Sequence, residues 1–339
     1  MPSLPTRKIG DANVTAIGWG AMGIAGVYGA PKPDEERLKF IDKVYELGCT
    51  NWDTADLYGD SEALIGKWLK KTGKRNEIFL ATKFGFALGD PTRPHGINGT
   101  PEHMRRQINQ SLTRLGVDYV DLYYLHRPDS TIPIEVTIGA MAELVKEGKV
   151  KYLGISECSE KTLRRAHAVH PISAVQVEYN PFTLDPEDEK IGIFKACKEL
   201  GIALVAYSPL GRGIITGRYK GPEDFDKTDI RLMIPRFSKE NFPNILKLSD
   251  GLKELGHKYN ATAGQITLAW LLAQSDNVIP IPGTSTIKYV EENLGALHIK
   301  LSPEDVAEVR KIAEHANAAQ GTRNPTAFIH LQYVDTPEL

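Results

Sequence analysis

The stretch 78–126 contains two apolar runs, IFLATKF (78–84) and VDLYYLH (120–126), on either side of a helix-type segment, PEHMRRQINQSLTRL (101–115). Each run is apolar along most of its length, as in strands of a parallel sheet that is covered on both faces. The segment between them begins with proline and is followed by Gly116, which are helix start and stop signals. The stretch therefore predicts a strand, a helix and a second, parallel strand.

The same alternation continues in both directions and predicts a (β/α)8 TIM barrel. A doubly wound sheet is the alternative, but the glycines of GWGAMGIAG (18–26) do not lead straight into a helix, as a dinucleotide-binding turn requires. The expected strands are 14–20, 50–53, 78–84, 120–126, 150–155, 174–179, 202–207 and 278–281. The expected helices are 34–47, 61–72, 101–115, 134–147, 159–169, 187–199, 262–274 and 286–296.

Two regions depart from this repeat. The segment 208–244 is too long for an ordinary loop and predicts a lid that covers a cofactor, followed by an extra helix at about 245–258. The tail, 317–339, is expected to be irregular and to fold over one mouth of the barrel. We expect one domain spanning residues 1–339.

Composition excludes several classes of protein. The net charge of −2 gives no reason to expect nucleic acid or an anionic membrane as a partner. The three cysteines are widely separated and form neither a disulfide framework nor a thiolate metal site. The N-terminus lacks the apolar core of a signal peptide, and no apolar run is long enough to span a bilayer. We therefore expect a cytoplasmic protein.

Four reactive side chains lie where expected strands end, the edge of a TIM barrel that carries the active site. They are Asp53, Tyr58, Lys83 and His126. Alone, the aspartate could cap a turn, the tyrosine could be a rim aromatic, and the histidine could bond to backbone. The lysine is more informative, because it interrupts an apolar run, where a buried ammonium needs a partner.

The combination suits reduction of a carbonyl group, which needs a hydride donor and an acid that protonates the developing alkoxide. An ammonium group lowers the pKa of a neighbouring tyrosine from about 10, and a carboxylate keeps that ammonium charged. An imidazole beside them can position the substrate oxygen by a hydrogen bond.

An ordered series of motifs, running from about residue 7 to 300, resembles the aldo-keto reductase superfamily. Within it, the chain is most similar to the fungal and plant enzymes related to perakine reductase. The motifs are DTADLYG (53–59), DSEALIG (60–66), TKF (82–84), YLHR (124–127), GIS (154–156), QVEYN (176–180), YSPLGRG (207–213) and IPGTSTIKYVEEN (281–293). The resemblance implies a catalytic tetrad at the four positions above, with Tyr58 as general acid, Lys83 as its partner, Asp53 as counter-ion and His126 as the substrate-orienting group.

The resemblance also implies NADP(H) as cofactor. Ser156 and Gln176 would bind the nicotinamide carboxamide, and Tyr207 would stack on the ring. Met22 and Asp53 are further candidates for cofactor contact. The pyrophosphate would lie against Ser208, Leu210, Gly211 and Arg212. The adenosine half would lie against Pro282, Gly283, Thr284, Ser285, Lys288, Glu292 and Asn293, with Arg218 reaching it from the long segment.

Three positions depart from the family pattern. Glu157 stands where many members have asparagine, and it could accept a hydrogen bond from the carboxamide. Gly283 replaces a lysine that faces the 2′-phosphate, and Tyr289 replaces an arginine. The candidates left for phosphate recognition are Arg218, Thr284, Ser285 and Lys288. We expect NADPH to be preferred.

The expected activity is reduction of an aldehyde or ketone to an alcohol, with Trp19, Met22, Tyr28 and Phe86 near the substrate and Arg127 at the rim. No metal site is expected, because no cluster of His or Cys has metal-ligand spacing. The alternative is a cofactor-binding regulatory protein similar to potassium-channel beta subunits, which share the barrel and the tetrad. The short segment before the first strand disfavours that use.

Overall fold

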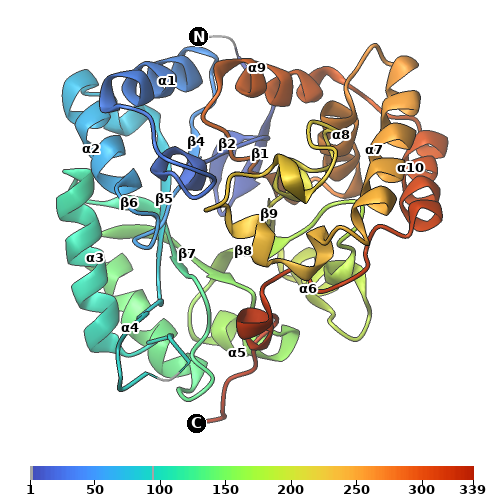
Figure 1. The fold of residues 1–339 in the computed structure, drawn as a ribbon. Helices are drawn as coiled ribbons and strands as arrows, with labels where there is room; N and C mark the ends of the chain where they lie inside the picture. The colour runs from blue at the N-terminus through green and yellow to red at the C-terminus, as the bar shows by residue number, and fades with distance from the viewer. Residues whose placement is uncertain (1–2, 94) are drawn as a thin grey trace.

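The computed structural model describes residues 3–93 and 95–339 (Figure 1). Its central feature is a sheet of eight parallel strands, in which each strand pairs with the next along the chain. The strands are β3 (Trp19–Gly20), β4 (Asn51–Asp53), β5 (Phe79–Phe84), β6 (Val120–Leu125), β7 (Val150–Ser156), β8 (Ile172–Glu178), β9 (Ala203–Tyr207) and β10 (Val278–Pro280).

The first and last strands close the sheet into a barrel. Gly18 N donates to the Pro280 carbonyl at 3.0 Å, and Gly20 N donates to the Pro282 carbonyl at 3.3 Å. Gly20 has to be glycine here, because a Cβ atom would lie 2.9 Å from the Ile281 carbonyl oxygen. The predicted (β/α)8 barrel is confirmed.

Helices surround the barrel, and the predicted ones are present. Thr100 caps the third helix by accepting from His103 N at 3.3 Å, and Gly116 ends it in the left-handed conformation. The helices are α1 (Asp34–Glu46), α2 (Ser61–Thr72), α3 (Pro101–Leu115), α4 (Ile134–Lys146), α5 (Glu160–Val169), α6 (Ile193–Leu200), α7 (Phe242–His257), α8 (Ala263–Gln274), α9 (Ile287–Gly295) and α10 (Pro303–Ala316). The predicted extra helix is α7.

The strands alternate between two apolar layers, so most of their residues are apolar. One set of side chains packs against the helices in the larger core cluster. The other set fills the barrel interior. The buried members of this interior cluster are Ile9, Val14, Ala81, Leu122, Tyr124, Ala174, Ala203, Val205, Ile279 and Ile281.

Three elements differ from the prediction. The run expected as one strand, 14–20, is divided: β2 (Ala12–Thr15) pairs with β1 (Thr6–Ile9) in a hairpin that adds Ile9 and Val14 to the interior cluster. α6 begins at Ile193 rather than at 187, because Gly192 is left-handed. α10 was not predicted; it packs against α7 (Figure 1).

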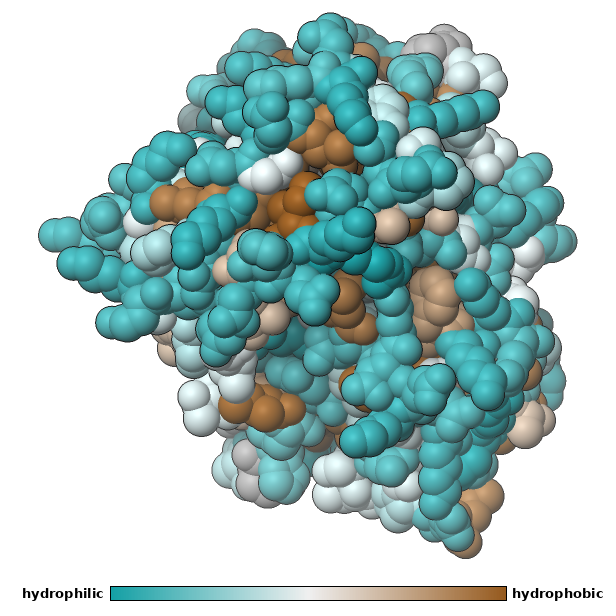
Figure 2. All heavy atoms as spheres, turned by 90° about the vertical axis from the view of Figure 1, so that its right-hand side faces the viewer, coloured by the Kyte–Doolittle hydropathy of each residue, from teal (hydrophilic) through white to brown (hydrophobic). Residues whose placement is uncertain are grey.

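The segment after β9 contains four short 3₁₀ turns before α7 begins. The tail after α10 runs along the barrel to α5, where Arg165 donates to the Thr336 and Pro337 carbonyls (Figure 1). Figure 2 shows the face on which α7 and α10 lie: it is mostly hydrophilic, with small separate hydrophobic patches. Among the described residues, no helix combines the length and apolarity needed to cross a membrane.

Candidate active site

Strand alternation directs a set of polar side chains into the barrel interior at the carboxyl ends of the strands. In β5, Ala81 belongs to the interior cluster, so Lys83, two residues on, points the same way. The same period places Ser156, Gln176 and Tyr207 on the interior face of β7, β8 and β9. The structure therefore brings together at one end of the barrel residues that are far apart in the sequence.

Lys83 is fully buried and ion-paired with Asp53. Its ammonium also donates to the Thr54 carbonyl at 2.8 Å, and the second oxygen of Asp53 accepts from Gln176 Nε2 at 2.8 Å. Burial works against the lysine charge, but Asp53 and Tyr58 outweigh it and raise the pKa of Lys83. The lysine is therefore a cation throughout the physiological pH range.

Tyr58 lies in the loop that follows β4 and is half-buried. The Lys83 ammonium is 5.0 Å from the centre of its ring. The His126 ring meets the tyrosine ring edge-on, with the two centres 5.8 Å apart. One partly exposed phenol thus lies beside a buried cation and an imidazole.

His126 follows β6 and is buried, and its Nδ1 atom has no hydrogen-bond partner. Burial and the charges of Lys83 and Arg127 hold the pKa of His126 well below its usual range, so the imidazole is neutral. Phe86 packs edge-on against it at 4.9 Å between ring centres. A neutral imidazole can donate a single hydrogen bond to a carbonyl oxygen. The structure thus places all four residues of the predicted tetrad in one cluster.

Asp56 lies in the same loop as Tyr58, and its Oδ1 atom is buried without a hydrogen-bond partner. Burial and the Glu62 carboxylate raise the pKa of Asp56 from 3.8 to about 7. The folded protein therefore keeps a proton that the unfolded chain loses, and stability falls as the pH rises through that range. We expect Asp56→Asn to raise the unfolding free energy by about 2–4 kcal/mol at pH 8 and by much less at pH 4. Thermal unfolding at both pH values tests this; an equal gain at both would contradict the assigned cause.

The positions predicted to hold the nicotinamide lie next to the tetrad. Ser156 Oγ accepts from Arg127 Nη1 at 3.0 Å, and Gln176 reaches Asp53 as described. Tyr207 is half-buried, and its hydroxyl donates to Glu157 Oε1 at 2.8 Å. Glu157 itself is fully buried, and Arg323 binds both of its carboxylate oxygens. Both carboxylate oxygens of Glu157 thus already accept hydrogen bonds from within the protein.

The turn after β9 has an unusual backbone. Gly211, Arg212 and Gly213 all have positive φ, at 54°, 57° and 85°. A Cβ atom on Gly211 would lie 2.6 Å from the Phe182 ring, so this position needs glycine for space as well as conformation. The Arg212 side chain donates to Asn324 at 3.2 Å, while its Nε atom is buried without a partner. Ser208 and Leu210 lie in the same turn.

The positions predicted to hold the adenosine half follow β10 and enter α9. Arg218 lies over the ring of Tyr289, 5.6 Å from its centre, so the long segment reaches α9. Lys288 is exposed on the same helix. Glu292 accepts from Thr262 Oγ1 at 2.6 Å. The remaining members of this set are Pro282, Gly283, Thr284, Ser285 and Asn293, of which Pro282 and Asn293 are buried.

Trp19, one of the expected substrate contacts, is buried in the helix-side core. Trp19 is 2% exposed and packs between Phe40 and Trp52, with ring centres 5.7 and 5.5 Å away. It belongs to the helix-side core, because strand alternation turns it away from the interior. Tyr28 contacts the long segment, where the Arg231 guanidinium is 5.0 Å from its ring centre. Met22, which lies between Trp19 and Tyr28 in the sequence, belongs to the short 3₁₀ helix Ala21–Ala25.

Sequence reasoning missed Arg323, which is 3% exposed and enters the barrel mouth from the tail. Its partners at Glu157 and Tyr207 lie more than 100 residues earlier. A second buried carboxylate, Glu178, lies 3.6 Å from the same guanidinium. One signal in the sequence could have pointed to Arg323: an acidic residue at position 157, if buried, needs a cationic partner.

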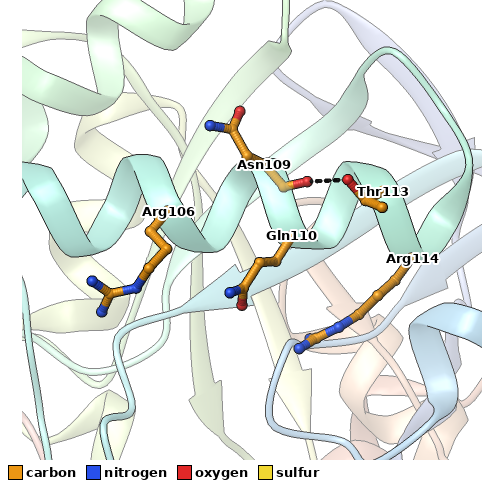
Figure 3. Close-up of a pocket in the computed structure, with 5 residues that line it drawn as sticks. All are labelled: Arg106, Asn109, Gln110, Thr113 and Arg114. Carbon is orange, nitrogen blue, oxygen red and sulfur yellow. Dashed lines mark hydrogen bonds between the residues drawn. The ribbon is translucent and has the colours of Figure 1, made fainter.

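A shallow hollow on α3 is lined by Arg106, Asn109, Gln110, Thr113 and Arg114 (Figure 3), and none of the predicted site residues lines it. Within residues 3–93 and 95–339, no group of three or more His, Cys, Asp or Glu side chains is arranged to hold a metal ion.

Comparison with known proteins agrees with the geometry. The profile of the Aldo/keto reductase family matches residues 16–314. The chain is 58% identical to the aldo-keto reductase str7 of Strobilurus tenacellus and 47% identical to the aldo-keto reductase yakc [NADP(+)] of Schizosaccharomyces pombe, each match covering 99% of both proteins. It is 43% identical to the probable aldo-keto reductase 1 of Glycine max, over 96% of this chain and 93% of that one.

Solved structures show the same likeness. A thermostable aldo-keto reductase in complex with the inhibitor epalrestat is 32% identical, with a TM-score of 0.72, over 91% of this chain and 100% of that one. The glycerol dehydrogenase of Gluconobacter oxydans is 27% identical, with a TM-score of 0.81, over 92% and 95%.

Proposed function

Because the chain belongs to the aldo/keto reductase family, we propose that it reduces aldehydes or ketones to alcohols with NADPH, and that Tyr58 donates the proton. The main support is that the half-buried phenol of Tyr58, the buried ammonium of Lys83 and the neutral imidazole of His126 lie together at one end of the barrel. The yeast relative, whose name includes NADP(+), supports the choice of cofactor.

The residues present fit NADP(H). Gly211 and Gly213 have positive φ and carry no side chain, so a phosphate could approach the backbone of this turn closely. Arg212 has a buried Nε atom without a partner, and Arg218 and Lys288 add exposed positive charge beside α9. When bound, the cofactor would supply the hydride.

The side chains of this chain supply the remaining functions. His126, neutral and buried beside Phe86, would donate a hydrogen bond to the substrate carbonyl and fix its oxygen near the phenol. Tyr58 would then protonate that oxygen as negative charge develops on it. Lys83 stabilises the phenolate that remains, and Asp53 keeps the lysine charged and in place.

The direct test follows cofactor absorbance with purified protein, NADPH or NADH, and a panel of aromatic and aliphatic aldehydes. We expect consumption of NADPH that depends on the aldehyde. The absence of turnover with either cofactor, combined with measurable NADPH binding, would contradict the reductase and favour a cofactor-binding partner protein. The absence of both binding and turnover would reject the cofactor assignment as well.

Charge beside α9 should decide the choice between NADPH and NADH. We expect Arg218→Ala combined with Lys288→Ala to raise the Kd of NADPH by about 10-fold or more, because two charge-assisted contacts to the 2′-phosphate are lost. The Kd of NADH should change by less than about 3-fold, because it lacks that phosphate. Fluorescence titration measures both.

The matched control removes two other exposed lysines, Lys70 on α2 and Lys253 on α7, and makes the same change in net charge. It should leave both affinities unchanged. If the Kd values of NADPH and NADH rise equally in the Arg218→Ala, Lys288→Ala variant, the 2′-phosphate is recognised by other residues.

A further inference from the structure

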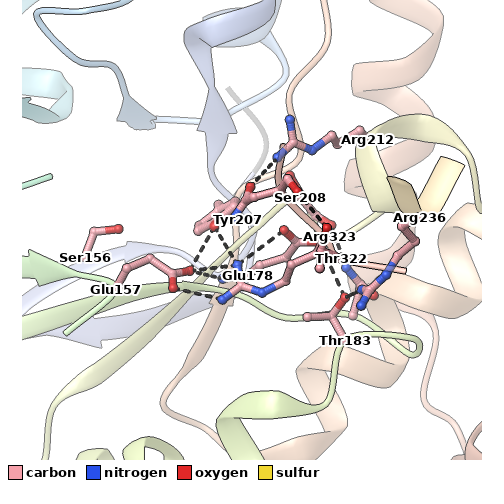
Figure 4. A network of polar contacts seen from close by, with 12 residues as sticks. Ser156, Glu157, Glu178, Thr183, Tyr207, Ser208, Arg212, Arg236, Thr322 and Arg323 are labelled. Atoms are coloured by element: carbon pink, nitrogen blue, oxygen red, sulfur yellow. Dashed lines mark hydrogen bonds and ion pairs between the residues drawn. The ribbon is translucent and has the colours of Figure 1, made fainter. Parts of the chain in front are cut away.

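The C-terminal tail places one buried guanidinium against the residue predicted to stack on the nicotinamide (Figure 4). Arg323 Nη1 donates to the Tyr207 hydroxyl at 3.0 Å and to Glu157 Oε1 at 3.1 Å, and Nη2 donates to Glu157 Oε2 at 2.9 Å. The Tyr207 hydroxyl in turn donates to Glu157 Oε1 at 2.8 Å. Three side chains thus form a closed ring of hydrogen bonds.

This ring fixes the orientation of the tyrosine. The Tyr207 hydroxyl donates one hydrogen bond and accepts another, and both partners are themselves held in place. The guanidinium binds the carboxylate through two parallel bonds, a geometry that restricts both groups. Rotation of the phenol away from its present position would break both hydrogen bonds.

The charges in this network are almost completely buried. Arg323, Glu157 and Glu178 are 3%, 0% and 2% exposed. Arg323 also lies 3.6 Å from Glu178 Oε2, an atom with no hydrogen-bond partner. Arg127 faces Glu157 from the β6 side, and Arg236 faces Glu178 from the long segment. Two buried carboxylates therefore depend on cations from three separate parts of the chain.

The backbone around the network is held in uncommon conformations. Six non-glycine residues of the described chain have positive φ, and four of them are Glu157, Ser208, Arg212 and Tyr333. Glu157 belongs to the network, Ser208 follows Tyr207, Arg212 donates to Asn324 next to Arg323, and Tyr333 lies in the tail. Strained backbone of this kind persists where the surroundings enforce it, and it is concentrated at functional sites.

The tail is also joined to Glu157 through the main chain. Val334 N donates to the Glu157 carbonyl at 2.8 Å, and Ser159 N donates to the Val334 carbonyl at 3.0 Å. Position 157 is therefore held by the tail through both its side chain and its backbone. The tail contacts the end of β7, the strand that carries Ser156.

We propose that Arg323 is a positioning residue of the cofactor site, which holds the Tyr207 ring in the orientation that stacks on the nicotinamide and keeps Glu157 from binding the carboxamide. This inference rests on the proposed function, since it takes Tyr207 as the stacking residue. It makes the tail a part of the cofactor site, and it leaves carboxamide recognition to Ser156 and Gln176.

The test compares two ligands that differ at the nicotinamide end. NADPH carries the nicotinamide, whereas 2′,5′-ADP carries only the adenosine half. We expect Arg323→Met to raise the Kd of NADPH by about 10-fold, the effect of losing one or two hydrogen bonds that position the ring. The Kd of 2′,5′-ADP should change by less than about 2-fold. Tyr207→Phe, which keeps the ring but removes the hydroxyl, should shift NADPH binding in the same direction.

Two further variants separate positioning from stability. Arg323→Met leaves the buried Glu157 carboxylate without the cation that is hydrogen-bonded to it and will lower the Tm, whereas Glu157→Gln combined with Arg323→Met removes both charges and should restore much of it. The double variant should still bind NADPH weakly. Arg165→Met is the matched control, because it loosens the far end of the tail without touching Tyr207. It should leave both affinities unchanged.

Each outcome has a definite meaning. Equal weakening of NADPH and 2′,5′-ADP, or full recovery of NADPH binding in the double variant, would overturn the inference and leave Arg323 a structural residue. Failure of the wild-type protein to bind either ligand would instead reject the proposed function. The positioning role is supported if Arg323→Met weakens the binding of NADPH but not of 2′,5′-ADP, and if the double variant binds NADPH equally weakly.

Discussion

Tyr58→Phe is expected to lower kcat by about 100-fold or more while the Kd of NADPH stays within about 2-fold of the wild-type value. The Tyr58 ring lies beside both the Lys83 ammonium and the His126 ring. The phenylalanine keeps the ring packing but leaves the developing alkoxide without an acid. Steady-state kinetics with an aromatic aldehyde, together with fluorescence titration of NADPH, measures the two effects separately.

The matched control is Tyr119→Phe. It makes the same chemical change just before β6, at the opposite end of that strand from His126, where the hydroxyl donates to Asn76 at 3.0 Å. Full activity in this variant would show that the loss at position 58 is local. An unchanged kcat in Tyr58→Phe would reject its role as proton donor.

Lys83→Met is expected to reduce both activity and stability. Lys83 is the cation that faces Asp53, and both side chains are buried. Removing it leaves a buried unpaired carboxylate, which costs about 3–5 kcal/mol of unfolding free energy. The phenolate left at Tyr58 also loses its neighbouring cation, so kcat should fall by about 100-fold or more. Denaturant unfolding and steady-state kinetics measure the two effects.

A double variant distinguishes the two roles. Asp53→Asn combined with Lys83→Met removes both charges, so most of the lost stability should return because no unpaired carboxylate remains. Activity should not return, because the lysine is still missing. Recovery of activity together with stability would mean that the ammonium acts only through folding.

The fold could be predicted because its repeat is local. The longer strands are mostly apolar on both faces, and some helices carry clear start and stop residues, such as Thr100, Pro101 and Gly116 in α3. The tetrad could be predicted for the same reason: Asp53, Lys83 and His126 stand at strand ends, and a closed parallel barrel brings those ends together.

The remaining features depend on contacts between distant parts of the chain. The side to which Trp19 points is decided by the pairing of β3, a strand of two residues, which no local pattern reveals. Arg323 stands in an irregular tail, and its pairing with Glu157 requires the tail to cross the barrel mouth. α10 carried a readable signal, with Ser302 capping Asp305 N and proline at the first position, but it lies beyond the eight-fold repeat.

The junction between β3 and β10, here called the seam, is the place where neighbouring strands of the barrel are joined at the fewest positions. Among the described residues, three hydrogen bonds cross it, donated by Gly18 N, Gly20 N and Trp19 Nε1, and two of the acceptors are proline carbonyls. The ladder at the seam consists of one isolated bridge, between Gly20 and Gly283, whereas the other neighbouring strands pair at two or more positions. Local unfolding should therefore begin here, and slow hydrogen exchange should be lost first at the two glycine amides. A ligand that contacts both the segment after β3 and the segment after β10 would hold the ring shut, so binding and barrel integrity are energetically linked.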